Sequence, residues 1–73
     1  MQTLDARGKS CPMPIVLTAK AMKALAPGDH LVVLANDRAF PEDVKAWCAK
    51  TGNDLVSLAR NGEHFEAEVR RAR

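Results

Sequence analysis

The sequence predicts an α+β fold, a two-layer α/β sandwich in which two helices cover one face of a four-stranded mixed sheet, with the element order β-α-β-α-β-β. Three observations predict it. Two segments have the apolar spacing of amphipathic helices, a continuous apolar run separates them, and the last third of the chain has the pattern of a hairpin around Asn61-Gly62. We expect residues 1–73 to form one small domain, because so short a chain buries only roughly 60% of its unfolded surface.

The first half of the chain is expected to form a strand and a helix. The strand covers residues 2–6 and ends before Gly8, which opens a tight loop. The helix covers residues 15–25, where apolar side chains recur at helical spacing and lysines occupy the opposite face. Its apolar stripe consists of Ile15, Val16, Ala19, Met22 and Leu25. Pro27-Gly28 then ends this helix.

The second half is expected to form a strand, a helix and a hairpin. Residues 31–35 are apolar without alternation, as in a strand that is central in a sheet or buried on both faces. A second helix opens at Pro41, which two acidic residues follow, and ends at Gly52. Its apolar stripe consists of Val44, Trp47, Cys48 and Thr51. Residues 55–60 and 65–69 then form the two strands of the hairpin.

Charge and composition exclude several classes of function. The formal net charge is +2 and the basic residues are scattered, which argues against nucleic-acid binding. One Trp, two Phe and no Tyr provide too few aromatic rings for base stacking. No apolar run approaches the ~20 residues that cross a bilayer, and the first nine residues lack the apolar core of a secretory signal. We therefore expect a cytoplasmic protein without membrane contact, whose two cysteines stay reduced.

The sequence also gives no reason to expect a cofactor or a metal. The four glycines are isolated from one another and form no phosphate-binding loop. The two cysteines and two histidines lack the close pairing of zinc ligands. His30 and His64 are therefore expected to be surface residues.

The candidate site is the segment Cys11-Pro12-Met13-Pro14. Two prolines just before a helical stripe indicate that the helix begins at one proline or the other, because the missing N–H of proline costs nothing in a first turn. Cys11 therefore lies within about two residues of the helix N-terminus, exposed on a polar loop. The partial positive charge of that terminus, together with Arg7 and Lys9, predicts a thiol with a modestly lowered pKa. The alternative is that Cys11 is a small apolar residue that fills a gap in the core.

The residues around this cysteine also resemble a known family. The run Leu4-Asp5-Ala6-Arg7-Gly8-Lys9-Ser10-Cys11-Pro12-Met13-Pro14 is similar to the signature of the TusA/SirA-like sulfur carrier proteins, in which an acidic residue and a glycine precede Cys-Pro-x-Pro at the start of a helix. The similarity extends over essentially the whole chain, including the Pro27-Gly28 turn and the closing hairpin. The resemblance implies the sandwich described above and a cysteine that carries sulfane sulfur as a persulfide.

The resemblance assigns roles to individual positions. Cys11 is then the residue that bears the persulfide, Pro12 and Pro14 shape the helix start, and Gly8 sets the preceding turn. Asp37 matches a commonly acidic position, on a loop that is expected to approach Cys11. Arg38 departs from the family pattern, since many relatives carry proline there, and this difference is expected to affect the loop and the partner that contacts it.

Partners are implied by the same resemblance. A cysteine desulfurase or a rhodanese-type protein would donate the sulfur, and the thiol of a downstream protein would accept it, by steps like those of thiol–disulfide exchange and without a cofactor. Arg7, Lys9 and Met13 are candidates for contact with these partners. A monomer suits a carrier that presents one residue to each partner in turn. The pathway stays open among tRNA thiolation, molybdenum cofactor synthesis and sulfur oxidation.

Two other functions fit the sequence. A non-catalytic regulatory module would dock through the first helix and the basic residues before it, and it would keep its activity in Cys11→Ser. A thiol redox sensor would pair Cys11 with Cys48. Cys48 belongs to the apolar stripe of the second helix, however, and is expected to face the core.

Overall fold

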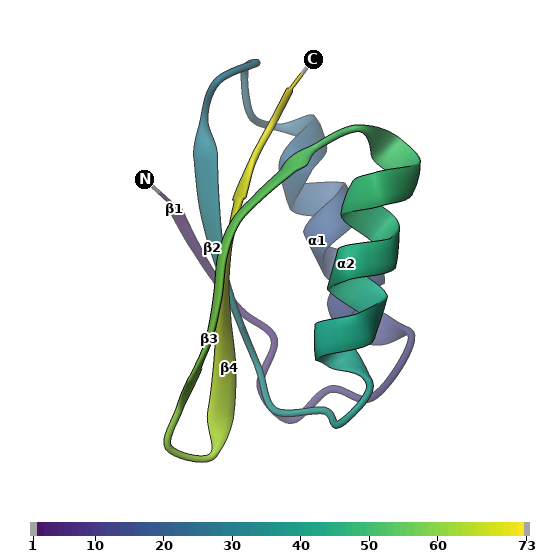
Figure 1. Cartoon of the computed structure of the whole chain (residues 1–73), viewed down its shortest axis with the longest axis vertical. Helices are drawn as coiled ribbons and strands as arrows, with labels where there is room; N and C mark the ends of the chain where they lie inside the picture. Colours follow the sequence, from purple (N-terminus) through teal and green to yellow (C-terminus); the bar gives the residue numbers. More distant parts are fainter. Residues whose placement is uncertain (1, 73) are drawn as a thin grey trace.

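The computed structural model describes residues 2–72, which form two helices packed on one face of a four-stranded sheet (Figure 1). The predicted fold class and element order are confirmed. The elements are β1 (Gln2–Asp5), α1 (Met13–Lys23), β2 (His30–Ala35), α2 (Phe40–Thr51), β3 (Asp54–Asn61) and β4 (His64–Arg70). Neither helix of the described residues is long and apolar enough to cross a membrane.

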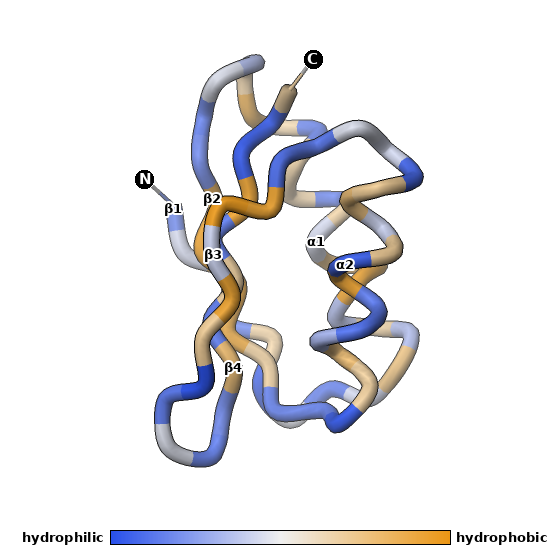
Figure 2. Tube along the Cα trace, viewed as in Figure 1, coloured by the Kyte–Doolittle hydropathy of each residue, from blue (hydrophilic) through white to orange (hydrophobic). Residues whose placement is uncertain are grey.

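A cluster of apolar side chains fills the space between the sheet and the helices. β2 and β4 turn alternate side chains toward the helices, and both helices contribute side chains from their inner faces. The cluster consists of Ala6, Met22, Leu25, Leu31, Val33, Ala35, Phe40, Val44, Cys48, Ala67 and Val69. The strands are most hydrophobic at mid-length, whereas the β3–β4 turn is hydrophilic (Figure 2). This core holds the two layers together and leaves the ends of the molecule to polar loops.

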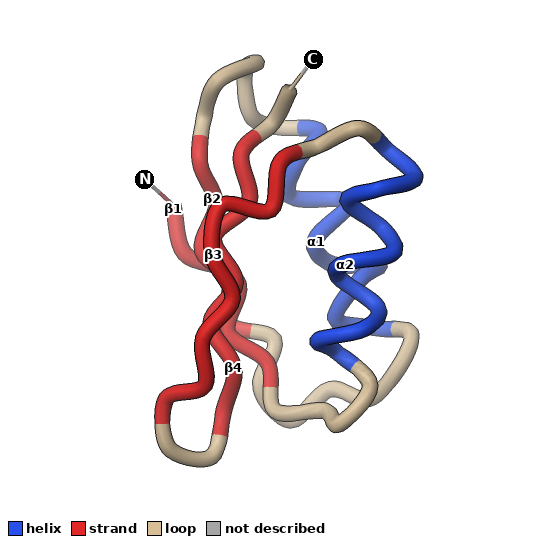
Figure 3. Tube along the Cα trace, in the orientation of Figure 1, coloured by secondary structure: helices blue, strands red, loops and turns tan. Residues whose placement is uncertain are grey.

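The strand order β1-β2-β4-β3 decides which loops meet. β1 is parallel to β2, and β4 is antiparallel to both β2 and β3. β1, β2 and β3 therefore run in one direction, so the helices that follow β1 and β2 begin at the same end of the sheet. The β1–α1 loop, the β2–α2 loop and the β3–β4 turn share this end (Figure 3). Residues that are far apart in the sequence are thereby brought to one edge.

β2 is a central strand, which is one of the two predicted alternatives. Its helix-facing residues are fully buried, but Val32 and Leu34 on the open face of the sheet are only half-buried. These two residues pair across the strands with Glu68 and Glu66 of β4. The continuous apolar run thus reflects a central position, with cross-strand neighbours covering part of the second face.

α1 begins between the two prolines, and its buried stripe matches the prediction only in part, since Met22 and Leu25 are buried as expected. The helix starts at Met13, with Pro14 in its first turn and Pro12 just outside it, so a start at either proline was wrong. Its buried residues are Pro14, Thr18 and Met22, whereas Val16 is 48% exposed. The hydroxyl of Thr18 donates to the carbonyl oxygen of Pro14 at 2.7 Å, and this hydrogen bond lets a polar residue lie in the core.

α2 and the hairpin match the prediction with small shifts. α2 starts one residue before Pro41 and ends at Gly52, whose φ of 79° and N–H donated to the Cys48 carbonyl at 2.9 Å close the helix. In the hairpin, Asn61 still pairs with His64, so the turn is Gly62-Glu63 rather than Asn61-Gly62. Gly62 has a φ of 65°, which suits glycine at the first central position of a two-residue hairpin turn.

Candidate functional site

Cys11 lies in the β1–α1 loop, which the rest of the protein holds in place. The backbone N–H of Ala6 donates to the Leu34 carbonyl at 2.7 Å, which extends the pairing of β1 with β2 beyond the strand end. Gly8 follows with a φ of +82°, and its N–H donates to Oδ1 of Asn36 in the β2–α2 loop at 2.9 Å. The loop therefore leaves the sheet in a fixed direction and carries an exposed cysteine.

The start of α1 leaves no backbone donor for the sulfur of Cys11. Pro12, joined to Cys11 by a cis peptide bond, has no N–H. The N–H of Met13 donates to the carbonyl of Ser10 at 2.8 Å, and Pro14 again has no N–H. The helix N-terminus therefore donates no backbone hydrogen bond to the sulfur of Cys11.

The side chain that contacts Cys11 is a carboxylate. The Cys11 Sγ donates a hydrogen bond to Oδ2 of Asp43, in the first turn of α2, at 3.1 Å. This hydrogen bond raises the pKa of Cys11 above its usual value, because the bond stabilises the protonated thiol. Partial loss of contact with water and the negative charges of Asp43 and Asp37 raise that pKa further. The predicted lowering of the Cys11 pKa is thus wrong.

The predicted basic neighbours do not offset these charges. The guanidinium of Arg7 binds the carboxylate of Asp5 in a bidentate pair, with Nε–Oδ1 and Nη2–Oδ2 distances of 2.9 Å. This pair lowers the pKa of Asp5 to about 2 and takes up the charge of Arg7. Lys9 is exposed on the same loop. Arg7 therefore compensates Asp5, two residues away, instead of Cys11.

Asp37 acts on Cys11 by charge rather than by contact. Its Oδ2 accepts the N–H of Ala39 at 3.2 Å, just before α2, and its negative charge contributes to the raised pKa of Cys11. The adjacent Arg38 is exposed on the same loop. The β1–α1 loop, the β2–α2 loop and the first turn of α2 thus bring together Cys11, Asp37 and Asp43.

Two residues of this arrangement were not singled out in the sequence. Asp43 was there only one of the two acidic residues that follow Pro41, and Asn36 was given no role. Two successive β–α units with parallel strands place both helix N-termini at one sheet end, so the sequence did contain a hint that the first turn of α2 faces the loop of Cys11.

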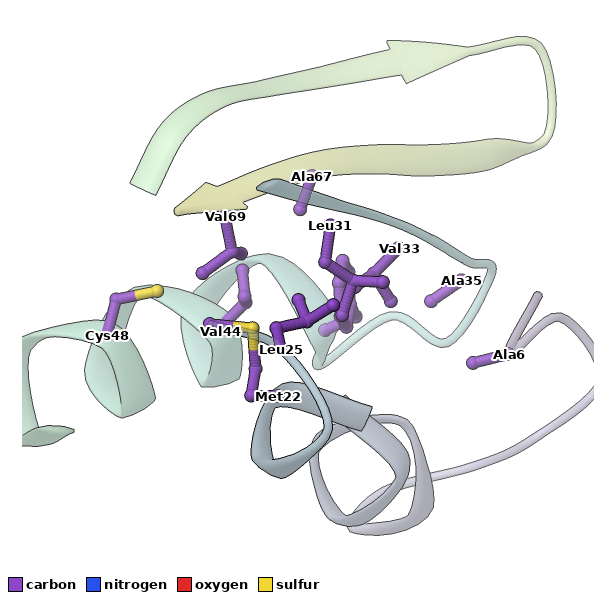
Figure 4. Close-up of a cluster of buried hydrophobic side chains, with 11 residues drawn as sticks. Ala6, Met22, Leu25, Leu31, Val33, Ala35, Val44, Cys48, Ala67 and Val69 are labelled. Carbon is purple, nitrogen blue, oxygen red and sulfur yellow. The ribbon is translucent and has the colours of Figure 1, made fainter. Parts of the chain in front are cut away.

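Cys48 lies apart from this site, in the core. It is 4% exposed on α2, and Figure 4 shows it at one end of the cluster that includes Val44, Met22 and Val69. Burial, the largest cause, and the charge of Asp54 raise the pKa of the Cys48 thiol. The predicted core position of Cys48 is confirmed, and a buried neutral thiol of this kind is a poor nucleophile.

The histidines lie on the open face of the sheet. Nδ1 of His30 is 2.6 Å from Oε2 of Glu68, and Nε2 of His64 is 3.8 Å from Oε2 of Glu66. Each histidine thus has a glutamate partner on β4. Among residues 2–72, no group of three or more His, Cys, Asp and Glu side chains is placed to hold a metal ion.

Comparison with known proteins identifies the family. The sequence profile described as Sulfurtransferase TusA matches residues 2–71. This chain belongs to the TusA family. The sulfur carrier protein TusA of Allochromatium vinosum is 34% identical over 71 residues, which are 97% of this chain and 93% of that protein. YrkI of Bacillus subtilis, named provisionally as a sulfur carrier protein, is 44% identical over 62 residues, which are 85% of this chain and 83% of that protein.

Other TusA-family relatives are longer. YrkF of Bacillus subtilis, also named provisionally as a sulfur carrier, is 43% identical over 65 residues, which are only 35% of its length. The chain thus spans about a third of that relative. The crystal structure of the SirA-like protein from Desulfitobacterium hafniense superposes with a TM-score of 0.84 over the whole of both chains, at 20% identity. That structure shows the shared fold.

Proposed function

We propose that this TusA-family protein carries sulfane sulfur as a persulfide on Cys11 and hands it from a donor protein to an acceptor protein. In the loading step, the sulfur of Cys11 attacks the terminal sulfur of a donor persulfide, R–S–SH. A new S–S bond forms to Cys11, the donor S–S bond breaks, and the donor leaves as a thiolate that takes up the proton lost by Cys11. Sulfane sulfur moves without any net oxidation, so the step needs no cofactor.

The observation that carries this proposal is the contrast between the two cysteines. Both are free, but Cys11 is exposed on a loop whereas Cys48 is enclosed in the core. A sulfur that two proteins must reach in turn has to be accessible without unfolding. The same contrast argues against a redox sensor, which would need the buried Cys48 to meet Cys11.

The surface next to Cys11 suits contact with partner proteins. Met13 and Val16 are 43% and 48% exposed, and they are neighbours on the surface of α1 because they lie three residues apart in its first turn. Lys9 and Arg7 lie on the loop that precedes them. An apolar centre beside charged residues is the usual composition of a protein–protein interface. We therefore place donor and acceptor contacts on this end of the molecule.

The partners of this proposal are a cysteine desulfurase or rhodanese-type donor and a downstream protein with an accepting thiol. The acceptor decides whether the sulfur enters tRNA thiolation, molybdenum cofactor synthesis or sulfur oxidation. Gly8, Pro12 and Pro14 hold Cys11 in place, and Asp37 influences its charge environment. We propose that the protein acts as a monomer in the cytoplasm, where thiols stay reduced.

The test is mass spectrometry of the intact protein after incubation with a cysteine desulfurase and cysteine. We expect a mass increase of one sulfur atom that a reductant reverses. The increase should disappear in Cys11→Ser and persist in Cys48→Ala, which is the matched control at the other cysteine. The carrier role would be refuted by a Cys11→Ser variant that still gains the sulfur. It would also be refuted by a wild-type protein that gains no sulfur from a cysteine desulfurase or from a rhodanese-type donor. A regulatory docking module predicts that the wild type gains no sulfur and that Cys11→Ser still binds its partner.

A further inference from the structure

The hydrogen bond between Cys11 and Asp43 joins two separate elements of the fold. Asp43 is half-buried, and it is followed directly by Val44, which is fully buried on the inner face of α2. Its carboxylate is therefore held by a packed helix rather than by a mobile loop. The 3.1 Å contact with Sγ spans 32 residues of sequence, so it depends on the tertiary fold and not on local chain geometry.

The negative charge beside the thiol is not neutralised within residues 2–72. Neither Asp43 nor Asp37 forms an ion pair there, whereas the neighbouring Glu42 pairs with Lys45 at 3.6 Å. The charged groups that act on Cys11 are Asp43 from α2 and Asp37 from the β2–α2 loop. Both disfavour the thiolate, which is the form that attacks a persulfide.

We infer that Asp43 is a positioning residue for the proposed transfer, which keeps the Cys11 thiol protonated and oriented until a partner protein supplies the base that removes its proton. This inference rests on the proposed function. Before Cys11 attacks, its proton must leave. Asp43 is far too weak a base to remove it from the thiol in the free protein, and both histidines face glutamates on the open side of the sheet. The base therefore comes from the partner, which returns the proton to the donor thiolate that leaves.

The consequence is a carrier whose sulfur is accessible to partner proteins but reacts slowly in the free protein. An exposed thiolate reacts with any electrophile or oxidant, whereas a thiol that stays protonated reacts slowly with both. Exposure and low reactivity have separate causes here, since the loop exposes Cys11 and Asp43 keeps its thiol protonated. Removing the charge of Asp43 should make the free protein more reactive, which is the opposite of the usual effect of altering a site residue.

The experiment is alkylation of Cys11 by iodoacetamide as a function of pH, followed by mass spectrometry of the peptide that contains Cys11. Asp43→Asn keeps the size of the side chain and removes its charge, and Glu42→Gln makes the same change at the adjacent, more exposed position. At pH 7 we expect Asp43→Asn to react about threefold faster for each unit by which the pKa of Cys11 falls, because the gain in thiolate is partly offset by its lower nucleophilicity. Glu42→Gln should react at the wild-type rate.

The pH profile separates an effect of charge from one of structure. Asp43→Asn should react faster than the wild type near pH 7 and no faster, or more slowly, in strongly alkaline solution, where the thiol is ionised in both and the thiolate of higher pKa is the better nucleophile. Equal rates at pH 7, or a constant ratio at every pH, would overturn the inference. Should Asp43→Asn not fold, titration of thiolate absorbance in Cys48→Ala, where Cys11 is the remaining thiol, decides instead, and a Cys11 that titrates at or below ~8.5 overturns the inference.

A second measurement separates this inference from the proposed function. Alkylation needs no sulfur donor. Its pH profile therefore tests whether Asp43 keeps the Cys11 thiol protonated, even if Cys11 never becomes a persulfide. Loading with glutathione persulfide should be faster in Asp43→Asn than in the wild type at pH 7. If Cys11 is loaded at the same rate in the wild type and in Asp43→Asn, and the two are also alkylated at the same rate, the role of Asp43 is overturned. The proposed carrier function is unaffected by that result.

Discussion

The side chain of Asn36 accepts the backbone N–H of Gly8 at 2.9 Å and so ties the loop of Cys11 to the loop that follows β2. The bond joins residues 28 positions apart, and it lies between the strand that ends at Asp5 and the cysteine. It fixes where the chain turns before it reaches the site. The geometry of Cys11 relative to Asp43 therefore depends on a contact that neither residue makes.

Replacing Asn36 should loosen this loop. In Asn36→Ala the N–H of Gly8 loses its acceptor, and we expect the free energy of unfolding to fall by about 0.5–1 kcal/mol, since a single hydrogen bond at an exposed position is worth little more. Urea denaturation measures this, and hydrogen exchange of the Gly8 amide should become faster. Asn36→Asp retains an acceptor oxygen and should keep that amide protected. Equal exchange of the Gly8 amide in Asn36→Ala and the wild type would contradict the role of Asn36.

Gly8 is needed for its backbone conformation rather than for space. A methyl group at this position would meet nothing within 4 Å, but the φ of +82° lies in the region that other L-residues avoid. We expect Gly8→Ala to lower the free energy of unfolding by about 1–2 kcal/mol. Gly8→Asn is the matched control, because asparagine tolerates a positive φ better, and it should lose less. Equal urea midpoints for the two variants would show that the loop adjusts its conformation instead.

The fold could be predicted from the sequence because its strongest patterns are local. The hairpin around Gly62 and the end of α2 at Gly52 each depend on residues within a few positions of one another. The buried stripe of α1 was predicted only in part, because its inner face also contains a threonine and a proline. Hydropathy does not select Thr18 as buried, since only its hydrogen bond to the Pro14 carbonyl makes burial favourable.

Only the local part of the candidate site could be predicted from the sequence. Cys11 is found next to its prolines in the sequence, whereas its partner Asp43 is 32 positions away and is identified only when the sheet order is known. The sign of the Cys11 pKa shift was missed chiefly because the hydrogen bond to Asp43 was not foreseen, and also because the charge of Arg7 was assigned to Cys11. In the structure that charge belongs to Asp5, which binds the guanidinium with both carboxylate oxygens.

Arg71 should contribute strongly to stability through the end of α1. Its Nη1 donates to the carbonyl oxygens of Met22, in the last turn of α1, at 3.0 Å and of Leu25, just after the helix. We expect Arg71→Met, which keeps the apolar stem, to lower the free energy of unfolding by about 1.5–3 kcal/mol. Urea denaturation tests this.

The adjacent Arg70 provides the control for Arg71. Its guanidinium pairs with the exposed Asp54 at 3.2 Å, and pairs of this kind contribute about 0–1 kcal/mol. Arg70→Met should therefore lose clearly less stability than Arg71→Met. Equal losses would mean that charge at the C-terminal end of β4, and not the capping of α1, is what stabilises the protein.

The pair of Asp5 and Arg7 should make stability depend on acid. The folded protein holds the pKa of Asp5 at about 2, below its ordinary value of 3.8, so the pair contributes fully above about pH 4 and its contribution is lost as the pH falls toward 2. Asp5→Asn keeps an oxygen for the Arg7 N–H but removes the charge, so its urea midpoint should fall less steeply than that of the wild type across this range. Both residues are exposed, so the difference should be small and should shrink in high salt. Parallel wild-type and Asp5→Asn curves between pH 4 and pH 2 at low salt would show that the pair does not stabilise the folded state.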